Sequence, residues 1–183
     1  MKIINGQLAE AQWVPSPNYS QRDEDEVSLL VIHNISLPPG QFGTGCVHQL
    51  FCNQLNPEDH EYFQAIADLK VSSHLLIERD GQLIQFVNFN DKAWHAGVSC
   101  YEGRANCNEY SIGIELEGTD NLPYTADQYQ ALHRVTLALL DAYPQLSIGR
   151  ITGHEQIAPG RKTDPGPAFD WDGYLGLLKA RQG

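Results

Sequence analysis

The stretch VSLLVIHNI, residues 27–35, decides how this chain folds. It is rich in β-branched residues and almost wholly apolar, and a short run of that kind is typical of a strand buried on both faces of a sheet. The sequence LPPGQFGTG, residues 37–45, follows and can continue neither a strand nor a helix. The pattern therefore predicts a central strand that ends abruptly in a turn of proline and glycine.

Two further strand patterns lie downstream. Residues 71–89 contain two alternating apolar runs on either side of Asp80-Gly81, which predicts a β-hairpin with a tight turn because glycine tolerates a positive φ. Residues 111–120 alternate between apolar and polar side chains, which predicts a strand with one apolar and one acidic face. Residues 91–110, between these patterns, have the composition of a loop.

Helical patterns alternate with the strands. Residues 125–143 show an apolar stripe at helical spacing, and Thr125 followed by Gln128 is typical of a capping box at a helix N-terminus. Three shorter helices are predicted over residues 46–55, 59–70 and 170–180. Strands and helices that interleave in this way indicate an α/β fold with a mixed central β-sheet flanked by helices.

Length and charge limit the classes of protein to which the chain can belong. Its 183 residues, 42% of them hydrophobic, predict a single domain, residues 1–183, with an irregular N-terminal arm over residues 1–26. The net charge of −11 argues against nucleic acids and anionic membranes as partners, because both require a basic surface. No apolar run resembles a secretory signal or a membrane span, so we expect a cytoplasmic protein.

Two histidines and one aspartate stand where chemistry is expected. His33 lies at the end of the central strand, where ligands commonly bind in sheet proteins. His154 and Asp164 belong to a second strand-like segment and the Pro/Gly loop that follows it. Two imidazoles and a carboxylate would leave the fourth position of a tetrahedral zinc ion open for water, as in catalytic zinc sites. The spacing alone leaves this hypothesis open, since no compact pair of histidines supports it.

Four longer motifs contain or surround these residues: LLVIHNISLPPGQFG (29–43), DKAWHAGVS (91–99), SIGIELEGTD (111–120) and GHEQIAPGRKTDPGPAFDW (153–171). They resemble the zinc N-acetylmuramoyl-L-alanine amidases, a family shared with peptidoglycan-recognition proteins and phage T7-type lysozyme amidases. The resemblance extends from about Val14 to Trp171 and implies the amidase/peptidoglycan-recognition fold. The chain departs from the family pattern at three loop positions, Glu155, Gln156 and Gly160.

The resemblance implies a role for each residue of the candidate site. One Zn²⁺ per chain would be held by the two histidines and the aspartate named above. Glu115 would act as the general base, and Lys162 would steady the oxyanion. Period-two spacing places Glu117 on the same strand face as Glu115, so composition alone does not separate these two carboxylates.

The resemblance also implies a substrate. The bond cut would be the amide between (1,6-anhydro-)N-acetylmuramic acid and the L-alanine of the stem peptide, in cytoplasmic recycling of peptidoglycan fragments. Such peptides carry carboxylates, so the cleft of a chain with a net charge of −11 must be locally cationic, and we expect the chain to act as a monomer. Six residues are candidates for substrate binding: Asn34, Lys70, Trp94, His95, Arg104 and Arg161.

Three other functions remain as alternatives. A binding module of the same fold would have lost a zinc ligand, whereas all three are present here. A thiol hydrolase would use Cys46 or Cys100 with a histidine, but no nucleophile motif surrounds either cysteine. A periplasmic amidase of the family would carry a signal or a lipoprotein cysteine near its start, and none is seen. The sequence therefore favours the enzyme.

Overall fold

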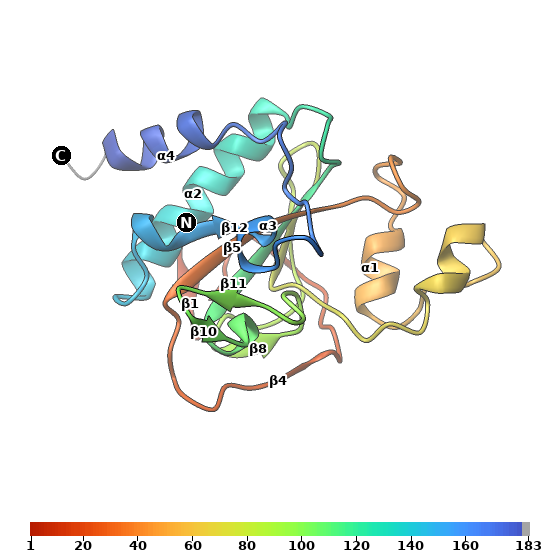
Figure 1. Ribbon diagram of the computed structural model, residues 1–183, viewed down its shortest axis with the longest axis horizontal. Coiled ribbons are helices and arrows are strands. Elements are labelled where there is room, and N and C mark those ends of the chain that lie inside the picture. The colour runs from red at the N-terminus through yellow and green to blue at the C-terminus, as the bar shows by residue number, and fades with distance from the viewer. Residues whose placement is uncertain (181–183) are drawn as a thin grey trace.

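A mixed six-stranded sheet lies at the centre of the computed structural model, which describes residues 1–180 (Figure 1). From one edge to the other, its strands are β12 (Ile151–Gly153), β5 (Leu29–Ile35), β11 (Ser111–Glu117), β6 (Leu75–Ile77), β7 (Leu83–Gln85) and β3 (Gln12–Trp13). The first four strands run parallel to one another, whereas β7 is antiparallel to β6. The long parallel pairing of β5 with β11 makes the apolar stretch of the sequence the buried middle of the molecule.

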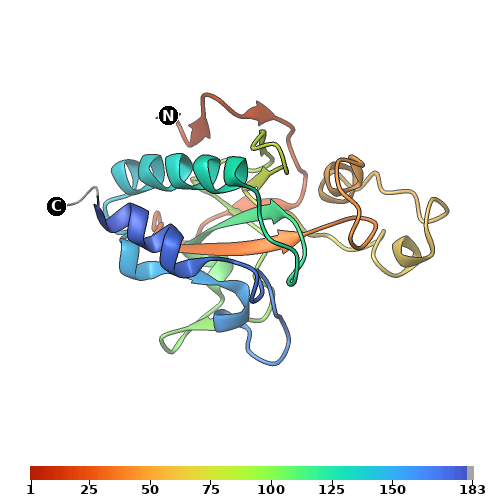
Figure 2. The same ribbon diagram turned by 90° about the horizontal axis from the view of Figure 1, so that it is seen from above.

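Two helices, α2 (Ala126–Ala142) and α4 (Trp171–Ala180), cover one face of the sheet (Figure 2). The predicted capping box starts α2, because the Thr125 hydroxyl accepts a hydrogen bond from the Gln128 backbone and the Gln128 side chain accepts one from Thr125. Leu132 and the rest of the apolar stripe join one buried cluster with side chains of β5 and β11. The mixed sheet flanked by helices is therefore confirmed.

The opposite face of the sheet is covered by residues 91–110. The sequence predicts a loop here, but the segment contains β8 (Asp91–Ala93), β9 (Cys100–Tyr101), β10 (Arg104–Ala105) and the 3₁₀ turn η2 (Cys107–Glu109). Elements of two or three residues are too short to leave a periodic pattern. Leu29 and Val31 of β5 share a buried cluster with Ala96 of this segment, and His33 follows on the same strand face by the period of two.

Residues 46–70 protrude to one side of the sheet (Figures 1 and 2). They contain α1 (Cys46–Phe51) and a single 3₁₀ turn, η1 (Glu61–Ala65), so both predicted helices are longer than the observed ones. Asn53, just beyond the first helix, has a φ of +58°, which a helix cannot continue. Tyr62 is one of the apolar residues at helical spacing that predict the helix over residues 59–70. It is 44% exposed, so little packing supports a longer helix there.

The N-terminal arm, expected to be irregular, contains four short strands. β1 (Ile3–Ile4) pairs with β2 (Gln7–Leu8), β3 forms an edge of the main sheet, and β4 (Tyr19–Gln21) pairs with β8. These strands are held by backbone hydrogen bonds in a polar sequence, which gives no hydrophobic alternation to recognise.

Two strand predictions need correction in detail. The hairpin of β6 and β7 is present, but its turn spans residues 79–81 rather than Asp80-Gly81 alone, and Gly81 has a φ of +83°. Strand β11 has no solvated acidic face, because residues 91–110 and the neighbouring loops cover it. Glu115 and Glu117 are only 8% and 5% exposed.

Strands β12, β5 and β11 end at the same edge of the sheet because they are parallel. The 3₁₀ turn η3 (Ile148–Arg150) leads into β12, and α3 (His154–Ile157) begins directly after it. Side chains at these strand ends are therefore brought together at one place. A search of residues 1–180 finds no helix with the length and hydrophobicity that a membrane span requires.

Candidate metal centre

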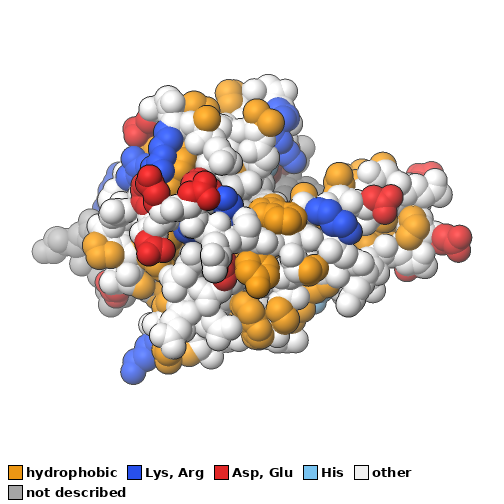
Figure 3. Space-filling model, turned by 90° about the horizontal axis from the view of Figure 1, so that it is seen from below, with side chains coloured by type: hydrophobic (Ala, Val, Ile, Leu, Met, Phe, Trp, Pro, Cys, Tyr) orange, Lys and Arg blue, Asp and Glu red, His pale blue; other side chains and the backbone are white. Residues whose placement is uncertain are grey.

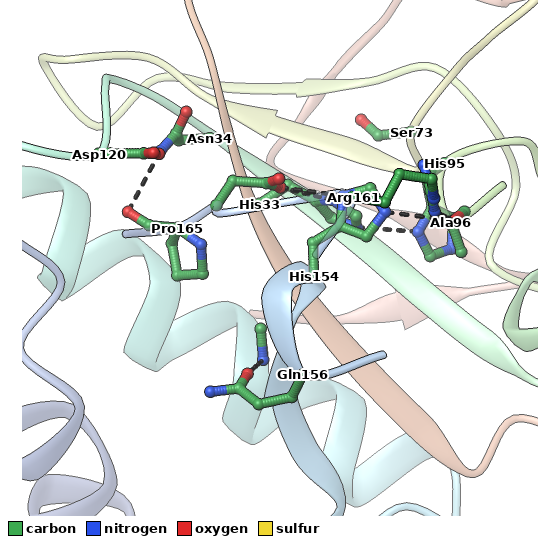
Figure 4. Close-up of polar contacts among 12 residues, drawn as sticks. His33, Asn34, Ser73, His95, Ala96, Asp120, His154, Gln156, Arg161 and Pro165 are labelled. Atoms are coloured by element: carbon green, nitrogen blue, oxygen red, sulfur yellow. Dashed lines mark hydrogen bonds and ion pairs between the residues drawn. The ribbon is translucent and has the colours of Figure 1, made fainter. Parts of the chain in front are cut away.

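Three side chains converge at this edge of the sheet. His33 comes from β5 and His154 is the first residue of α3 (Figure 4). Asp164 lies in the loop that follows α3. The two Nδ1 atoms of the histidines are 2.9 Å apart, and each is 3.1 Å from Oδ2 of Asp164. The structure thus brings together the three residues that the sequence analysis selected as metal ligands.

These three atoms fit a divalent cation. Tetrahedral zinc with ligands at roughly 2.0–2.1 Å keeps neighbouring ligand atoms about 3.3 Å apart, close to the separations seen here. Burial lowers the pKa of His33 to about 4. Burial alone would raise the pKa of Asp164, but its hydrogen bonds with His154 and His33 hold it below its usual value. At neutral pH the site therefore presents neutral His33 and a carboxylate, the forms that bind metals.

The second nitrogen of each histidine points away from this triangle. Nε2 of His33 lies 2.9 Å from Nδ1 of His95, and Nε2 of His154 lies 3.2 Å from the carbonyl oxygen of Ala96 (Figure 4). Because a carbonyl oxygen only accepts hydrogen bonds, Nε2 of His154 carries the proton and its Nδ1 keeps a free lone pair. The ring is therefore turned to offer that lone pair to a cation.

Glu115 lies beside the triangle. It stands opposite His33 in the parallel pairing of β11 with β5 and lines the cleft in front of the site. Its Oε2 atom is buried and has no hydrogen-bond partner within residues 1–180. Burial, and next the charge of Asp164, raises the pKa of Glu115 well above its usual value. A buried carboxyl group without a partner, facing a cleft, is able to exchange protons there.

Glu117, which composition alone does not distinguish from Glu115 as the general base, has a different environment. Its Oε1 accepts a hydrogen bond of 2.6 Å from the backbone of Gly43, and its Oε2 accepts one of 3.3 Å from the backbone of Arg79. The side chain therefore joins the Pro/Gly turn after β5 to the β6–β7 hairpin. Its hydrogen bonds make Glu117 a structural residue.

A cleft of about 360 Å³ opens in front of the three ligands. Its polar wall includes His154, Asp164, Glu115 and Lys162. Its apolar wall comes from the protruding segment and its neighbours, and includes Leu50, Tyr62, Ile66, Leu69, Val71 and Trp94. Apart from Trp94, the sequence analysis missed this apolar wall, for which exposed apolar residues at irregular spacing are a signal.

The six candidate substrate-binding residues divide into two groups. Asn34, Trp94 and His95 line the cleft, whereas Lys70, Arg104 and Arg161 are not among its lining residues. Arg104 instead forms an ion pair of 2.8 Å with Glu26. The two cysteines of the thiol alternative, Cys46 and Cys100, do not line the cleft either.

One of these candidates, Asn34, holds the site's own loops. Nδ2 of Asn34 donates to Oδ1 of Asp120 at 2.9 Å and to the carbonyl of Pro165 at 3.1 Å, so both of its hydrogens are used (Figure 4). The same carbonyl accepts a hydrogen bond of 2.7 Å from the Tyr124 hydroxyl. These contacts fix the loop that carries Asp164. No local pattern reveals them, because the partners lie far apart in the sequence.

A few cations within residues 1–180 form ion pairs with neighbouring carboxylates. On the face drawn in Figure 3, Lys and Arg side chains form small separate groups, some of them next to acidic ones. Lys92 pairs with Glu109, and Arg104 pairs with Glu26. Lys162, in contrast, lines the cleft and forms no ion pair with another residue of the range 1–180. It is the one cation among the residues that line this cleft.

Comparison with known proteins gives a consistent result. The sequence model of the N-acetylmuramoyl-L-alanine amidase family matches residues 23–167. The 1,6-anhydro-N-acetylmuramyl-L-alanine amidase AmpD of Citrobacter freundii is 56% identical over 179 residues, which cover 97% of this chain and 95% of the relative.

Solved structures agree with this match. A crystal structure of a selenomethionine derivative of AmpD has a TM-score of 0.94 at 55% identity, and the match covers 97% of this chain and 99% of that one. AmpDh3 from Pseudomonas aeruginosa, solved in complex with an anhydromuramic pentapeptide, has a TM-score of 0.62 at 27% identity. That match covers 84% of this chain and 60% of the other.

The different environments of the two carboxylates predict opposite effects on stability. Glu117→Gln should lower the free energy of unfolding by about 0.5–1.5 kcal/mol, because one of its two part-buried hydrogen bonds from backbone N–H groups is lost. Glu115→Gln should leave the free energy unchanged or raise it, because it replaces a buried carboxyl group whose Oε2 has no partner within residues 1–180 by a group that cannot ionise. Urea denaturation of the metal-free proteins at pH 7 measures both. Equal destabilisation by the two variants would contradict this assignment.

Proposed function

The chain belongs to the N-acetylmuramoyl-L-alanine amidase family, and we propose that it hydrolyses the amide between 1,6-anhydro-N-acetylmuramic acid and the L-alanine of a stem peptide. The observation that carries this proposal is the triangle of His33, His154 and Asp164 at the base of a cleft that also contains Glu115 and Lys162. The printed activity of the relative at 56% identity supports the choice of bond. Residues 1–183 would form one such domain.

Zinc is the metal that best suits these ligands. Two imidazole nitrogens and one carboxylate oxygen form a three-ligand set, which in catalytic zinc sites leaves a fourth position for water or substrate. When bound, one zinc ion per chain would polarise the scissile carbonyl and make water a nucleophile near neutral pH. His33 and His154 would supply Nδ1 and Asp164 would supply Oδ2, the three atoms that already face one another.

Glu115 would move the protons of the reaction. Glu115 lines the cleft beside His33, and its Oε2 atom has no hydrogen-bond partner within residues 1–180, so the carboxyl group can take a proton from the attacking water and later give it to the departing L-alanine nitrogen. The same carboxyl group can do both because burial raises its pKa well above its usual value, which makes it a better proton acceptor and still a proton donor. Its fixed place in β11 keeps it at one position throughout the reaction.

Lys162 would stabilise negative charge on the former carbonyl oxygen. It lines the cleft without an ion-pair partner within residues 1–180, so its ammonium group is available to the substrate. Removing one such donor from an active site typically costs about 3–4 kcal/mol of transition-state stabilisation. The same charge would attract the carboxylates of the stem peptide to a protein that is strongly acidic as a whole.

We place this activity in the cytoplasm, on soluble 1,6-anhydro fragments released in peptidoglycan turnover. The proposal is supported by the AmpD relatives, whose printed name specifies the 1,6-anhydro sugar. The apolar wall of the cleft, with Trp94 and Tyr62, would face the sugar, and the polar wall would face the amide. A binding module without hydrolysis is disfavoured because the ligand set is complete and the Glu115 carboxyl has no structural partner.

Loss of one ligand should remove the metal. We expect His154→Ala to retain only traces of zinc after dialysis and to lose hydrolysis, because two ligands do not hold the ion. Elemental analysis and mass spectrometry of an anhydromuropeptide digest measure these effects. His60→Ala, a histidine that only caps the 3₁₀ turn η1, is the matched control and should keep both properties. Stoichiometric zinc and normal turnover in His154→Ala would contradict the assignment.

Loss of the proposed base should separate chemistry from metal binding. Glu115→Gln should keep one zinc per chain and lower kcat by about 10²–10⁴-fold, the usual contribution of a general acid–base. Lys162→Met should lower kcat more than it raises KM. Steady-state kinetics with Glu117→Gln as the control tests this. If Glu115→Gln keeps the full kcat and Glu117→Gln loses it, the general base is Glu117 and the assignment to Glu115 is wrong.

A further inference from the structure

Two consecutive residues, His95 and Ala96, contact both histidine ligands on the side away from the metal position. Nδ1 of His95 lies 2.9 Å from Nε2 of His33, and the carbonyl of Ala96 lies 3.2 Å from Nε2 of His154 (Figure 4). One short segment between β8 and β9 therefore touches both rings, through the His95 side chain and the Ala96 carbonyl. The sequence analysis considered His95 only as a substrate-binding residue.

Hydrogen bonds join His33 to His95 and His95 to Ser111, and Ser111 determines the direction of each. The Ser111 hydroxyl lies 2.6 Å from the carbonyl oxygen of Cys107, a distance that requires the hydroxyl to donate its only proton there. Oγ of Ser111 is then an acceptor for Nε2 of His95, 3.1 Å away. With its proton on Nε2, His95 accepts at Nδ1 from His33, and His33 keeps a lone pair on its own Nδ1.

The surroundings hold His95 in this state. Oδ1 of Asn108 accepts hydrogen bonds from the backbone N–H groups of His95, at 3.1 Å, and Ala96, at 2.8 Å. Gly113 of β11 has no positive φ, yet a Cβ there would lie 2.4 Å from Cγ of His95, so the glycine leaves room for the ring.

We propose that His95 and Ala96 are positioning residues that fix the tautomers of both histidine ligands, so that each presents Nδ1 to the metal. Ser111 determines which ring nitrogen of His95 carries the proton, and Asn108 holds the backbone of His95 and Ala96. Both ring nitrogens of His95 are already occupied, by His33 and Ser111, so neither is left for substrate. The inference rests on the proposed zinc site. Outer partners of metal-bound histidines typically change metal affinity by about 10–100-fold.

Variants of His95 test the proposal through zinc affinity, measured by competition with a chelator on the purified full chain. His95→Leu should weaken zinc binding by about 10–100-fold, because His33 loses the acceptor that orients it. His95→Asn should recover most of the affinity, since its Oδ1 stands near the place of Nδ1 and accepts the same hydrogen bond.

A milder pair of variants keeps the test valid if His95→Leu fails to fold. Ser111→Ala and Tyr110→Phe each remove a buried hydroxyl that donates to a backbone carbonyl, but only Ser111 contacts His95. Ser111→Ala should weaken zinc binding, by less than His95→Leu does, and Tyr110→Phe should leave it unchanged. Thermal unfolding of the metal-free variants reports the structural cost separately.

Two results would overturn the inference. One is zinc affinity within about threefold of the parent in both His95→Leu and Ser111→Ala, well below the usual effect of an outer partner. The other is an equal loss in His95→Asn and His95→Leu, which would show that the acceptor is irrelevant. A parent chain that binds no zinc at all would instead reject the proposed function, and this inference with it.

Discussion

The convergence of three lone-pair donors at one edge of a parallel sheet is the constraint on which the rest of the site depends. Nδ1 of His33, Nδ1 of His154 and Oδ2 of Asp164 lie 2.9–3.1 Å from one another. Neutral imidazole nitrogens and a carboxylate are all acceptors, so these atoms repel one another unless a proton or cation lies between them. The fold imposes the arrangement, because β12 and β5 are parallel neighbours and Asn34 holds the loop of Asp164.

The parts of the fold that carry long periodic signals could be predicted from the sequence. The apolar strand predicted over residues 27–35 and the helix that starts at Thr125 are both encoded by the residues of the segment itself. Both form as expected. The mixed sheet follows from their alternation. The short strands of the N-terminal arm and of residues 91–110 could not be predicted, because backbone pairing over two or three residues, rather than side-chain pattern, defines them.

The candidate site shows the same division. Motifs at strand ends point to His33 and His154, and the structure brings them together. Composition alone did not separate Glu115 from Glu117, and the family resemblance selected Glu115. The contacts of Glu117 with Gly43 and Arg79 add the physical reason, because they give Glu117 a structural role. The environment of His95 was hidden, since its partners come from three separate segments. Composition identifies the reactive groups, whereas their orientation depends on residues distant in the sequence.

X-ray absorption at the zinc edge of the loaded, full-length chain is the most direct test of this account. It predicts a single shell of nitrogen and oxygen atoms at about 2.0 Å, with the multiple scattering of two imidazoles and one position that exchanges with small anions. A sulfur neighbour at about 2.3 Å, or four protein donors that leave no exchangeable position, would contradict a catalytic metal held by two histidines and an aspartate.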